Sequence, residues 1–326
     1  MLGIISLLLH KTKELETGLV IKTTGSWHTV QDSKKKAIPC KIKGKLRTGG
    51  SRSTNPLAVG DKVEFYRLEK ESTGIITGIL DRKNYIIRKS SKLSKETHVL
   101  AANLDQAFLM ISLTLPRTTL RFIDRFLATS EAYQIPAILI FNKTDLYDKD
   151  LMAEMEQLAE MYGSIGYESV KTSAIQKIGL DELRFRMKNR INLVAGNSGV
   201  GKSSIINAMD PSLGLKTRPV SEIHKTGRHT TTFSEMFELS SGGYIIDTPG
   251  IKGFGIIDMD KEEIFHFFPD IFAVSKECQY YNCLHINEPN CAVKTAVEEN
   301  KLSLSRYESY LSLYYDDTGK YRTTKY

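Results

Sequence analysis

The apolar positions divide the chain into regions of different pattern. Between residues 17 and 97, short runs alternate apolar or β-branched residues with polar ones, and glycine-containing turns separate them. This pattern is typical of a small β-barrel. From about residue 104, continuous apolar runs such as 105–113 and 136–141 alternate with segments of helical spacing. Buried parallel strands that alternate with helices indicate an α/β domain.

A third region begins near residue 257, where helical pieces surround a group of cysteines and lead into a polar tail. The sequence thus predicts a β-barrel over residues 1–98, an α/β domain over 99–256 and a mostly helical domain over 257–326. No apolar run approaches the ~20 residues that span a bilayer. The apolar start MLGIISLLLH has no basic segment before it and no small-residue cleavage site, so we expect a cytoplasmic protein rather than a secreted one.

Charge is distributed unevenly between these regions. Residues 1–98 contain 20 Lys and Arg against 9 Asp and Glu, a net charge of +11, whereas the remainder has a net charge of −4. Such asymmetry favours a nucleic-acid-binding module joined to a nearly neutral one. A solubilising basic face is the alternative on charge alone.

GNSGVGKSS at 196–204 fits the phosphate-loop pattern, and it follows the apolar strand INLVA and precedes a helix. Glycines allow the backbone to turn tightly and direct N–H groups at phosphate oxygens. The lysine supplies a positive charge to the β- and γ-phosphates, and the next hydroxyl can bind Mg²⁺. We assign nucleotide binding to the whole loop: Gly196, Asn197, Ser198, Gly199, Val200, Gly201, Lys202, Ser203 and Ser204.

NKTD at 142–145 directly follows a predicted strand, at the end where α/β sheets bind ligands. The carboxylate of Asp145 can accept both the N1–H and the exocyclic amine of guanine, a donor pair that adenine lacks. Asn142 can bind the base edge or brace neighbouring loops, and the stem of Lys143 can cover the base. KTSA at 171–174 suggests a second base loop. The predicted guanine contacts are Asn142, Lys143, Thr144, Asp145, Ser173 and Ala174.

DTPG at 247–250 and GRHTTT at 227–232 complete the set. Asp247 can hold the magnesium shell through water, and the Gly250 N–H can reach the γ-phosphate. Together with Ser203, a threonine of GRHTTT can bind Mg²⁺; of the three consecutive threonines we choose Thr231.

The order of these motifs is unusual. GTP-binding proteins ordinarily begin with the phosphate loop and end with the base motifs, but here NKTD and TSA come first. Circular permutation is tolerated because domain termini lie at the surface, often close together. The segment after DTPG then leads directly into the cysteine-bearing domain. We therefore hypothesise that this domain is a lever driven by the nucleotide state.

Three of the four cysteines lie close together and form, with one histidine, the pattern C-x₄-C-x-H-x₅-C. Three thiolates and one imidazole make a complete tetrahedral set for structural Zn²⁺, with no open position for catalysis. The predicted ligands are Cys278, Cys283, His285 and Cys291. Cys40 stands alone, and we expect it to be buried.

With these motifs in this order, the chain resembles the RsgA/YjeQ family of ribosome small subunit-dependent GTPases over residues 17 to about 300. The resemblance implies an N-terminal OB-fold, a central permuted GTPase and a C-terminal zinc domain. It also implies late maturation of the small ribosomal subunit, with GTP hydrolysis to GDP stimulated by that subunit. Expected partners are the subunit with its rRNA and GTP or GDP, with no membrane contact, and we expect a monomer. A basic barrel agrees with this, and Trp27, Phe65, Tyr66 and Tyr85 are candidates for stacking on bases or for the core.

Ile251 follows DTPG where many GTPases have a glutamine that orients water. The resemblance points to His229 as its substitute, so the predicted catalytic residues are His229, Lys202 and Gly250. His229 could instead pack or contact RNA. The alternative function is an RNA-binding assembly scaffold that uses GTP mainly as a conformational ligand.

Overall fold

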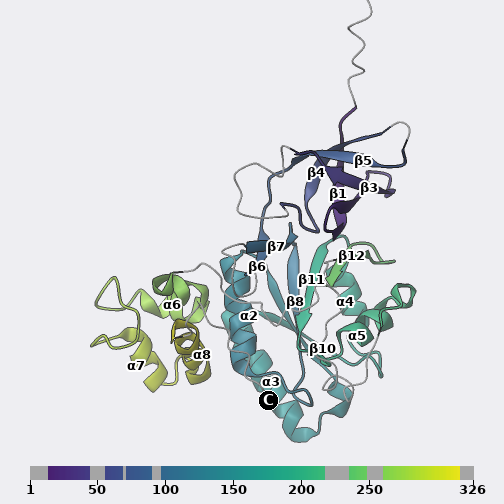
Figure 1. Cartoon of the computed structure of the whole chain (residues 1–326). Coiled ribbons are helices and arrows are strands. Elements are labelled where there is room, and N and C mark those ends of the chain that lie inside the picture. Colours follow the sequence, from purple (N-terminus) through teal and green to yellow (C-terminus); the bar gives the residue numbers. More distant parts are fainter. Residues whose placement is uncertain are drawn as a thin grey trace, which may run out of the picture.

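The computed structural model describes residues 14–44, 56–68, 71–89, 97–216, 235–247 and 260–315, and the statements below concern these residues. A β-barrel lies at one end of an α/β domain, and a small helical domain lies beside helix α2 (Figure 1). Among these residues, no helix is both long enough and apolar enough to cross a membrane.

The N-terminal domain is a closed five-stranded barrel. Strands β1 and β4 pair, which closes the sheet order β1-β2-β3-β5-β4 into the topology of an OB-fold. Burial alternates along β3, so that Ile38 and Cys40 enter the core. Phe65 is also buried there, whereas Trp27 remains 39% exposed. The strands are β1 Glu16–Thr24, β2 Trp27–Gln31, β3 Ala37–Ile42, β4 Lys62–Arg67 and β5 Gly74–Ile79.

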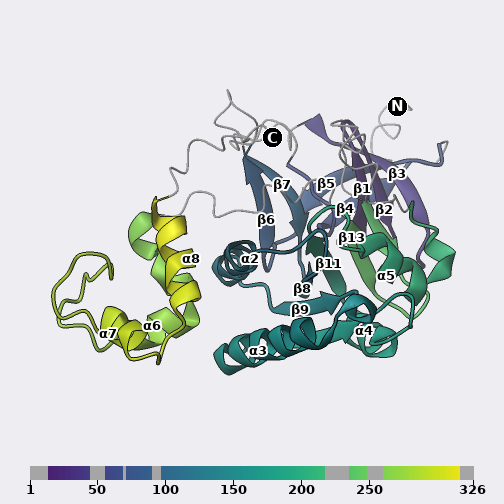
Figure 2. The ribbon, with the colours of Figure 1, turned by 90° about the horizontal axis from the view of Figure 1, so that it is seen from below.

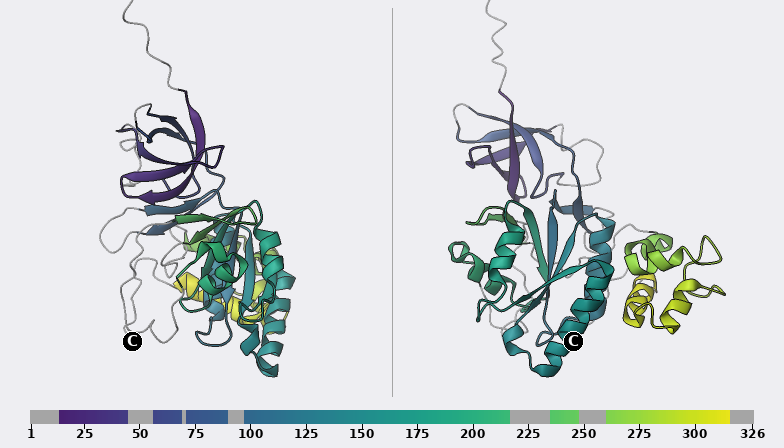
Figure 3. Two further views of the ribbon diagram at one scale, coloured as in Figure 1. Left: turned by 90° about the vertical axis from the view of Figure 1, so that its right-hand side faces the viewer. Right: turned by 180° about the vertical axis from the view of Figure 1, so that it is seen from behind.

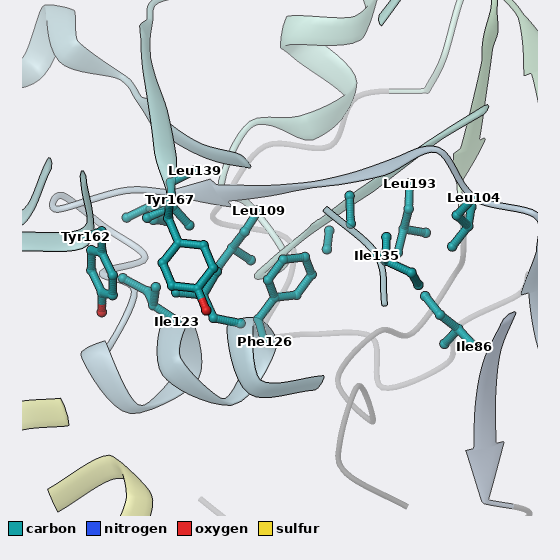
Figure 4. Close-up of a cluster of buried hydrophobic side chains, with 14 of the residues drawn as sticks. Ile86, Leu104, Leu109, Ile123, Phe126, Ile135, Leu139, Tyr162, Tyr167 and Leu193 are labelled. Carbon is teal, nitrogen blue, oxygen red and sulfur yellow. The ribbon is translucent and has the colours of Figure 1, made fainter. Parts of the chain in front are cut away.

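The strand expected at NYIIRKS forms, but it is not part of the barrel. As β6 (Tyr85–Lys89) it pairs with β7 (Thr97–Ala102) in a separate two-stranded sheet. The barrel closes through the pairing of β1 with β4, without β6. Ile86 packs instead into the core of the α/β domain, near Leu104 and Ile135 (Figure 4).

The central sheet has the order β10-β9-β8-β11-β13-β12. Five strands are parallel, and β12 is antiparallel to its neighbour. Every residue of β8 is buried, as expected for a strand covered on both faces. The strands are β8 Gln106–Ile111, β9 Ala137–Asn142, β10 Glu168–Thr172, β11 Ile191–Gly196, β12 Glu235–Glu238 and β13 Tyr244–Asp247.

Helices cover both faces of this sheet. Leu109 of β8 belongs to the cluster that contains residues of α2 (Leu120–Ala132) and α3 (Lys149–Ile165) (Figure 4). The next residue, Met110, packs with α4 (Leu180–Met187) and α5 (Lys202–Met209). The alternation of side chains along each strand therefore separates two helical layers (Figure 2). Short 3₁₀ helices, η1 (Thr144–Leu146) and η2 (Pro211–Leu213), follow β9 and α5.

The barrel joins the α/β domain along β12, as the side view in Figure 3 shows. Lys22 of β1 pairs with Glu235 in the ladder, and their side chains form an ion pair at 2.8 Å. Gln31 of β2 contacts the side chains of both Glu238 and Tyr244. The two domains are thus connected through β1 and β2 of the barrel and β12 and β13 of the central sheet.

The C-terminal domain consists of η5 (Lys261–Phe267), α6 (Pro269–Ser275), α7 (Ala292–Glu298) and α8 (Leu304–Tyr315). Its core includes Phe268, Ile271 and Tyr310 together with two of the cysteines. Helices α8 and η5 contact α2, which places this domain against the α/β domain.

Candidate guanine nucleotide site and metal cluster

The predicted nucleotide motifs meet at the carboxyl edge of the parallel sheet. Gly196 at the end of β11 is in register with Met110 of β8, and Asn142 at the end of β9 is in register with Thr172 of β10. The phosphate loop, NKTD and TSA therefore begin from the same edge, where α/β sheets bind ligands.

The phosphate loop has the backbone conformation that its glycines allow. Gly196, Gly199 and Gly201 have φ values of 144°, 80° and 105°. A Cβ at Gly201 would lie 2.4 Å from Nδ2 of the Asn142 side chain. Glycine is therefore needed here to leave room for Asn142 as well as for its backbone conformation. Helix α5 begins directly afterwards at Lys202. The partial positive charge of its N-terminus therefore lies next to the phosphate loop.

The side chain of Lys202 extends back over the phosphate loop. Its Nζ donates to the carbonyls of Gly196 and Asn197, at 2.7 and 2.9 Å. Ser203 is half-buried on the first turn of α5, and Ser204 is exposed. Of the other loop residues, Asn197 and Ser198 are half-buried and Val200 is buried in the core.

Asn142 connects three loops. Its side chain is 1% exposed; Nδ2 donates to the Val200 carbonyl at 2.9 Å, and Oδ1 accepts from the Thr172 hydroxyl at 3.0 Å. Its backbone carbonyl accepts from Tyr147. Of the two roles open for Asn142 from the sequence, this arrangement favours the brace, since both ends of the amide are engaged by protein.

Lys143 lies beside the phosphate loop. Its backbone is left-handed, with φ 65°, and its Nζ donates to the carbonyls of Leu115 and Gly199, at 2.8 and 3.0 Å. Partial burial lowers the pKa of this ammonium, and the carboxylate of Asp145 opposes the shift. The aliphatic stem is thereby stretched between two loops, as a cover over the base requires.

The base loops are held to one another. Thr144 donates to the Thr172 carbonyl at 3.1 Å, and the Ser173 hydroxyl donates to Asp145 Oδ1 at 2.5 Å. Ser173 also exchanges backbone hydrogen bonds with Ile178, which closes the loop that contains Ala174. One carboxylate oxygen of Asp145 is therefore fixed by Ser173, and the second oxygen can accept hydrogen bonds from other donors.

Several predicted residues cannot be placed. His229, Thr231 and Gly250 lie outside the described residues. Asp247 is the last residue of β13, which runs parallel to β11, so its backbone lies at the same edge as the phosphate loop. The magnesium ligands, Ser203 included, and the catalytic histidine thus stay predictions.

The four predicted metal ligands come together in the C-terminal domain, with ligand atoms all within 4.8 Å of one another. Cys278 Sγ and Cys291 Sγ each lie 3.5 Å from His285 Nδ1 and 3.9 Å from one another. Zn–S bonds of about 2.3 Å and Zn–N bonds of about 2.0–2.1 Å imply edges of about 3.8 and 3.6 Å in a tetrahedron. The cluster, which includes buried Cys283, fits zinc.

A family model described as RsgA GTPase matches residues 79–257, and one described as RsgA N-terminal domain matches residues 17–76. The chain belongs to the RsgA GTPase family. It is 54% identical to small ribosomal subunit biogenesis GTPase RsgA of Bacteroides fragilis, over 94% of this chain and 98% of the relative. The corresponding protein of Flavobacterium psychrophilum is 51% identical, over 95% and 96%.

Solved structures agree with this membership. The crystal structure of YjeQ from Thermotoga maritima matches with a TM-score of 0.78 and 34% identity, covering 94% of this chain and all of that chain. YloQ, a circularly permuted GTPase, matches with a TM-score of 0.72 and 32% identity, covering 94% and 96%. As an RsgA-family GTPase, the chain is a GTP hydrolase with an OB-fold barrel and a permuted GTPase domain.

Two residues at the RsgA-type site were not predicted from the sequence. Tyr147 donates to the Asn142 carbonyl and accepts from the Leu113 N–H, both at 2.9 Å, and the Leu115 carbonyl holds Lys143. Leu115 lies in the segment between β8 and α2, and Tyr147, which follows η1, connects the base loop to that segment through Leu113. No local motif identifies them, because the contacts between the base loop and that segment join residues 28 to 34 positions apart.

Proposed function

We propose that this GTPase acts in late maturation of the small ribosomal subunit, in the cytoplasm and as a monomer. It binds the subunit through rRNA with GTP in its site, and the subunit stimulates hydrolysis to GDP and phosphate. The observation that supports GTP as the ligand is the Asn142 brace, which joins a phosphate loop to a base loop that carries an aspartate. The named relatives, all small ribosomal subunit biogenesis GTPases, support the biological role.

Each part of the site has a role in this reaction. Phosphate-loop N–H groups and Lys202 neutralise the charge that develops on the β- and γ-phosphates. Ser203, Thr231 and Asp247 would hold Mg²⁺, for which hydroxyl and carboxylate oxygens are suitable ligands, and this ion supplies further charge neutralisation. In this proposal the Gly250 N–H would contact the γ-phosphate, and His229 would orient the attacking water, which the apolar Ile251 cannot do.

The C-terminal cluster has a structural role in this proposal. Cys278, Cys283, His285 and Cys291 would bind one Zn²⁺ per chain, and four protein ligands leave no position for a substrate. Zinc would stabilise the loop that precedes α7 rather than take part in hydrolysis.

Steady-state GTP turnover with and without purified small subunits tests the proposal. We expect slow intrinsic turnover that rises at least tenfold with subunits, because the catalytic segment has no glutamine after DTPG. Lys202→Ala is the control, since it should abolish both activities while the protein stays folded. If subunits bind the protein but do not change its turnover, the scaffold function replaces this one.

A further inference from the structure

A buried arginine joins the helical domain to the GTPase domain. Arg306 of α8 is 0% exposed, and its Nε and Nη2 donate to both oxygens of Asp270 on α6, at 3.0 and 2.7 Å. Its Nη1 donates to Asp124 on α2 at 2.8 Å. Asp124 is also 0% exposed and accepts a hydrogen bond from Tyr162 of α3 at 2.9 Å. One side chain therefore links two GTPase-domain helices to two helices of the zinc-cluster domain.

The following turn of α8 contacts the zinc-cluster loop. The Tyr307 hydroxyl donates to the carbonyl of His285, a predicted zinc ligand, at 2.6 Å. The Tyr310 hydroxyl donates to the Leu284 carbonyl at 2.5 Å. Helix α8 thus carries, within five residues, the contacts to the GTPase domain and the contacts to the loop that supplies the metal ligands.

Few buried apolar side chains of α2 face the helical domain, so apolar contact contributes little to this junction. Most apolar residues of α2, such as Ile123 and Phe126, pack towards the central sheet. Within the described residues, Ala128 is the α2 member of the buried cluster of the helical domain. A cleft of about 330 Å³ opens beside Asp270 between α3 and α6. Docking therefore depends on the paired charges, and loss of one partner would leave a buried charge without compensation.

We propose that α8 is a bracket that fixes the zinc-cluster domain to α2, with Arg306 as the positioning residue. The zinc-cluster domain and α2 then move as one rigid body rather than as a lever against each other. Helix α2 starts shortly after Leu115, whose carbonyl accepts a hydrogen bond from Lys143 of the base loop. A shift of this rigid body would therefore be transmitted to the base loop. Stimulation by the small subunit, which rests on the proposed function, would use this connection.

The test compares two full-length variants. Arg306→Met removes the hydrogen bonds to Asp124 and Asp270 and keeps the tyrosines that contact the zinc-cluster loop. Glu308→Gln, at an exposed position of the same helix, is the matched control. Hydrogen–deuterium exchange of residues 120–132, small-angle scattering and zinc content are measured without subunits, followed by turnover with and without them.

We expect Arg306→Met to keep one zinc per chain and intrinsic turnover within about twofold of the unaltered protein. Its α2 amides should exchange at least tenfold faster, and its radius of gyration should increase, while Glu308→Gln changes neither. Subunit-stimulated turnover should fall at least tenfold. An Arg306→Met protein with unaltered α2 exchange and scattering would overturn the bracket.

Asp124→Asn is the second variant if Arg306→Met does not fold. Asp124 is the α2 partner of Arg306, so its change should give the same signature in weaker form, and unchanged α2 exchange would again overturn the proposal. Exchange and scattering need no subunits. Absence of stimulation in the unaltered protein would therefore refute the proposed function and leave the bracket to be decided separately.

Discussion

At the scale of single residues, the nucleotide site is organised by side chains that hold loops rather than by those that face the ligand. Asn142 occupies the space that a side chain at Gly201 would take, and it satisfies buried polar groups of two loops. Buried amides with all their hydrogen bonds made give a site a fixed geometry. This pre-organisation leaves Asp145 with its carboxylate positioned by Ser173 before any base binds.

Asp145→Asn should reverse the base preference. Asparagine presents an amine where guanine also donates, whereas xanthine offers a carbonyl there, so GTP binding should weaken about 10- to 100-fold and xanthosine triphosphate binding should strengthen. The remaining Oδ1 can still accept from Ser173, which keeps the loop in place. Competition titrations of both nucleotides give the result, with Ser173→Ala as the control that weakens both. Unchanged preference in Asp145→Asn would mean that NKTD does not select the base.

At the scale of elements, short segments without regular structure are stabilised by the helices next to them. The loop that contains the predicted metal ligands has His285 in a left-handed conformation, φ 61°, and its N–H groups at Leu284 and Ile286 donate to Glu288. Tyrosines of α8 bind its carbonyls. These contacts hold the loop, and we expect a bound metal to contribute to its shape as well.

Cys283→Ser should remove zinc and destabilise the C-terminal domain. The buried sulfur belongs to a four-ligand set, and metal binding contributes folding free energy at such sites. Metal analysis by mass spectrometry should find one zinc in the unaltered protein and less than a tenth of that in the variant. Cys40→Ser, in the barrel core, is the control that should keep zinc. Protein purified without chelator that contains no zinc would reject the ligand set.

At the scale of the whole molecule, the domains are joined more closely than their separate sequences indicate. Asn103 donates to the Gly60 carbonyl of the barrel, and Arg82, which follows the barrel, pairs with buried Asp61. A cut after residue 98 would divide β7. The role of the basic barrel is therefore better tested by substitution than by truncation.

Replacing Lys34, Lys36 and Lys43 with glutamine should weaken binding to small subunits and reduce its salt dependence. All three side chains are exposed on the barrel, and each phosphate contact contributes about 0.7–0.9 to the slope of log K against log salt. We expect the slope to decrease by about 2 to 3 while intrinsic GTP turnover stays the same. Binding is measured by co-sedimentation over a series of salt concentrations.

The matched control replaces three exposed lysines of the GTPase domain, Lys149, Lys177 and Lys188. It should leave the slope within about one of the original value. Equal effects of the two sets would show that attraction to the subunit follows total charge, and the barrel would then have no special role in RNA binding.

The sequence by itself determined the motifs and their permuted order, and from the phosphate loop, the base motifs and the candidate metal ligands it predicted the chemistry. These motifs need particular residue types at fixed spacing within one strand–loop–helix unit, so local sequence is sufficient. Tertiary structure alone decided that Asn142 hydrogen-bonds to Val200 and Thr172, that β6 lies outside the barrel, and that Arg306 meets Asp124. That last pair is 182 positions apart. Contacts of this kind depend on how whole elements pack, and no local pattern encodes the packing of distant elements.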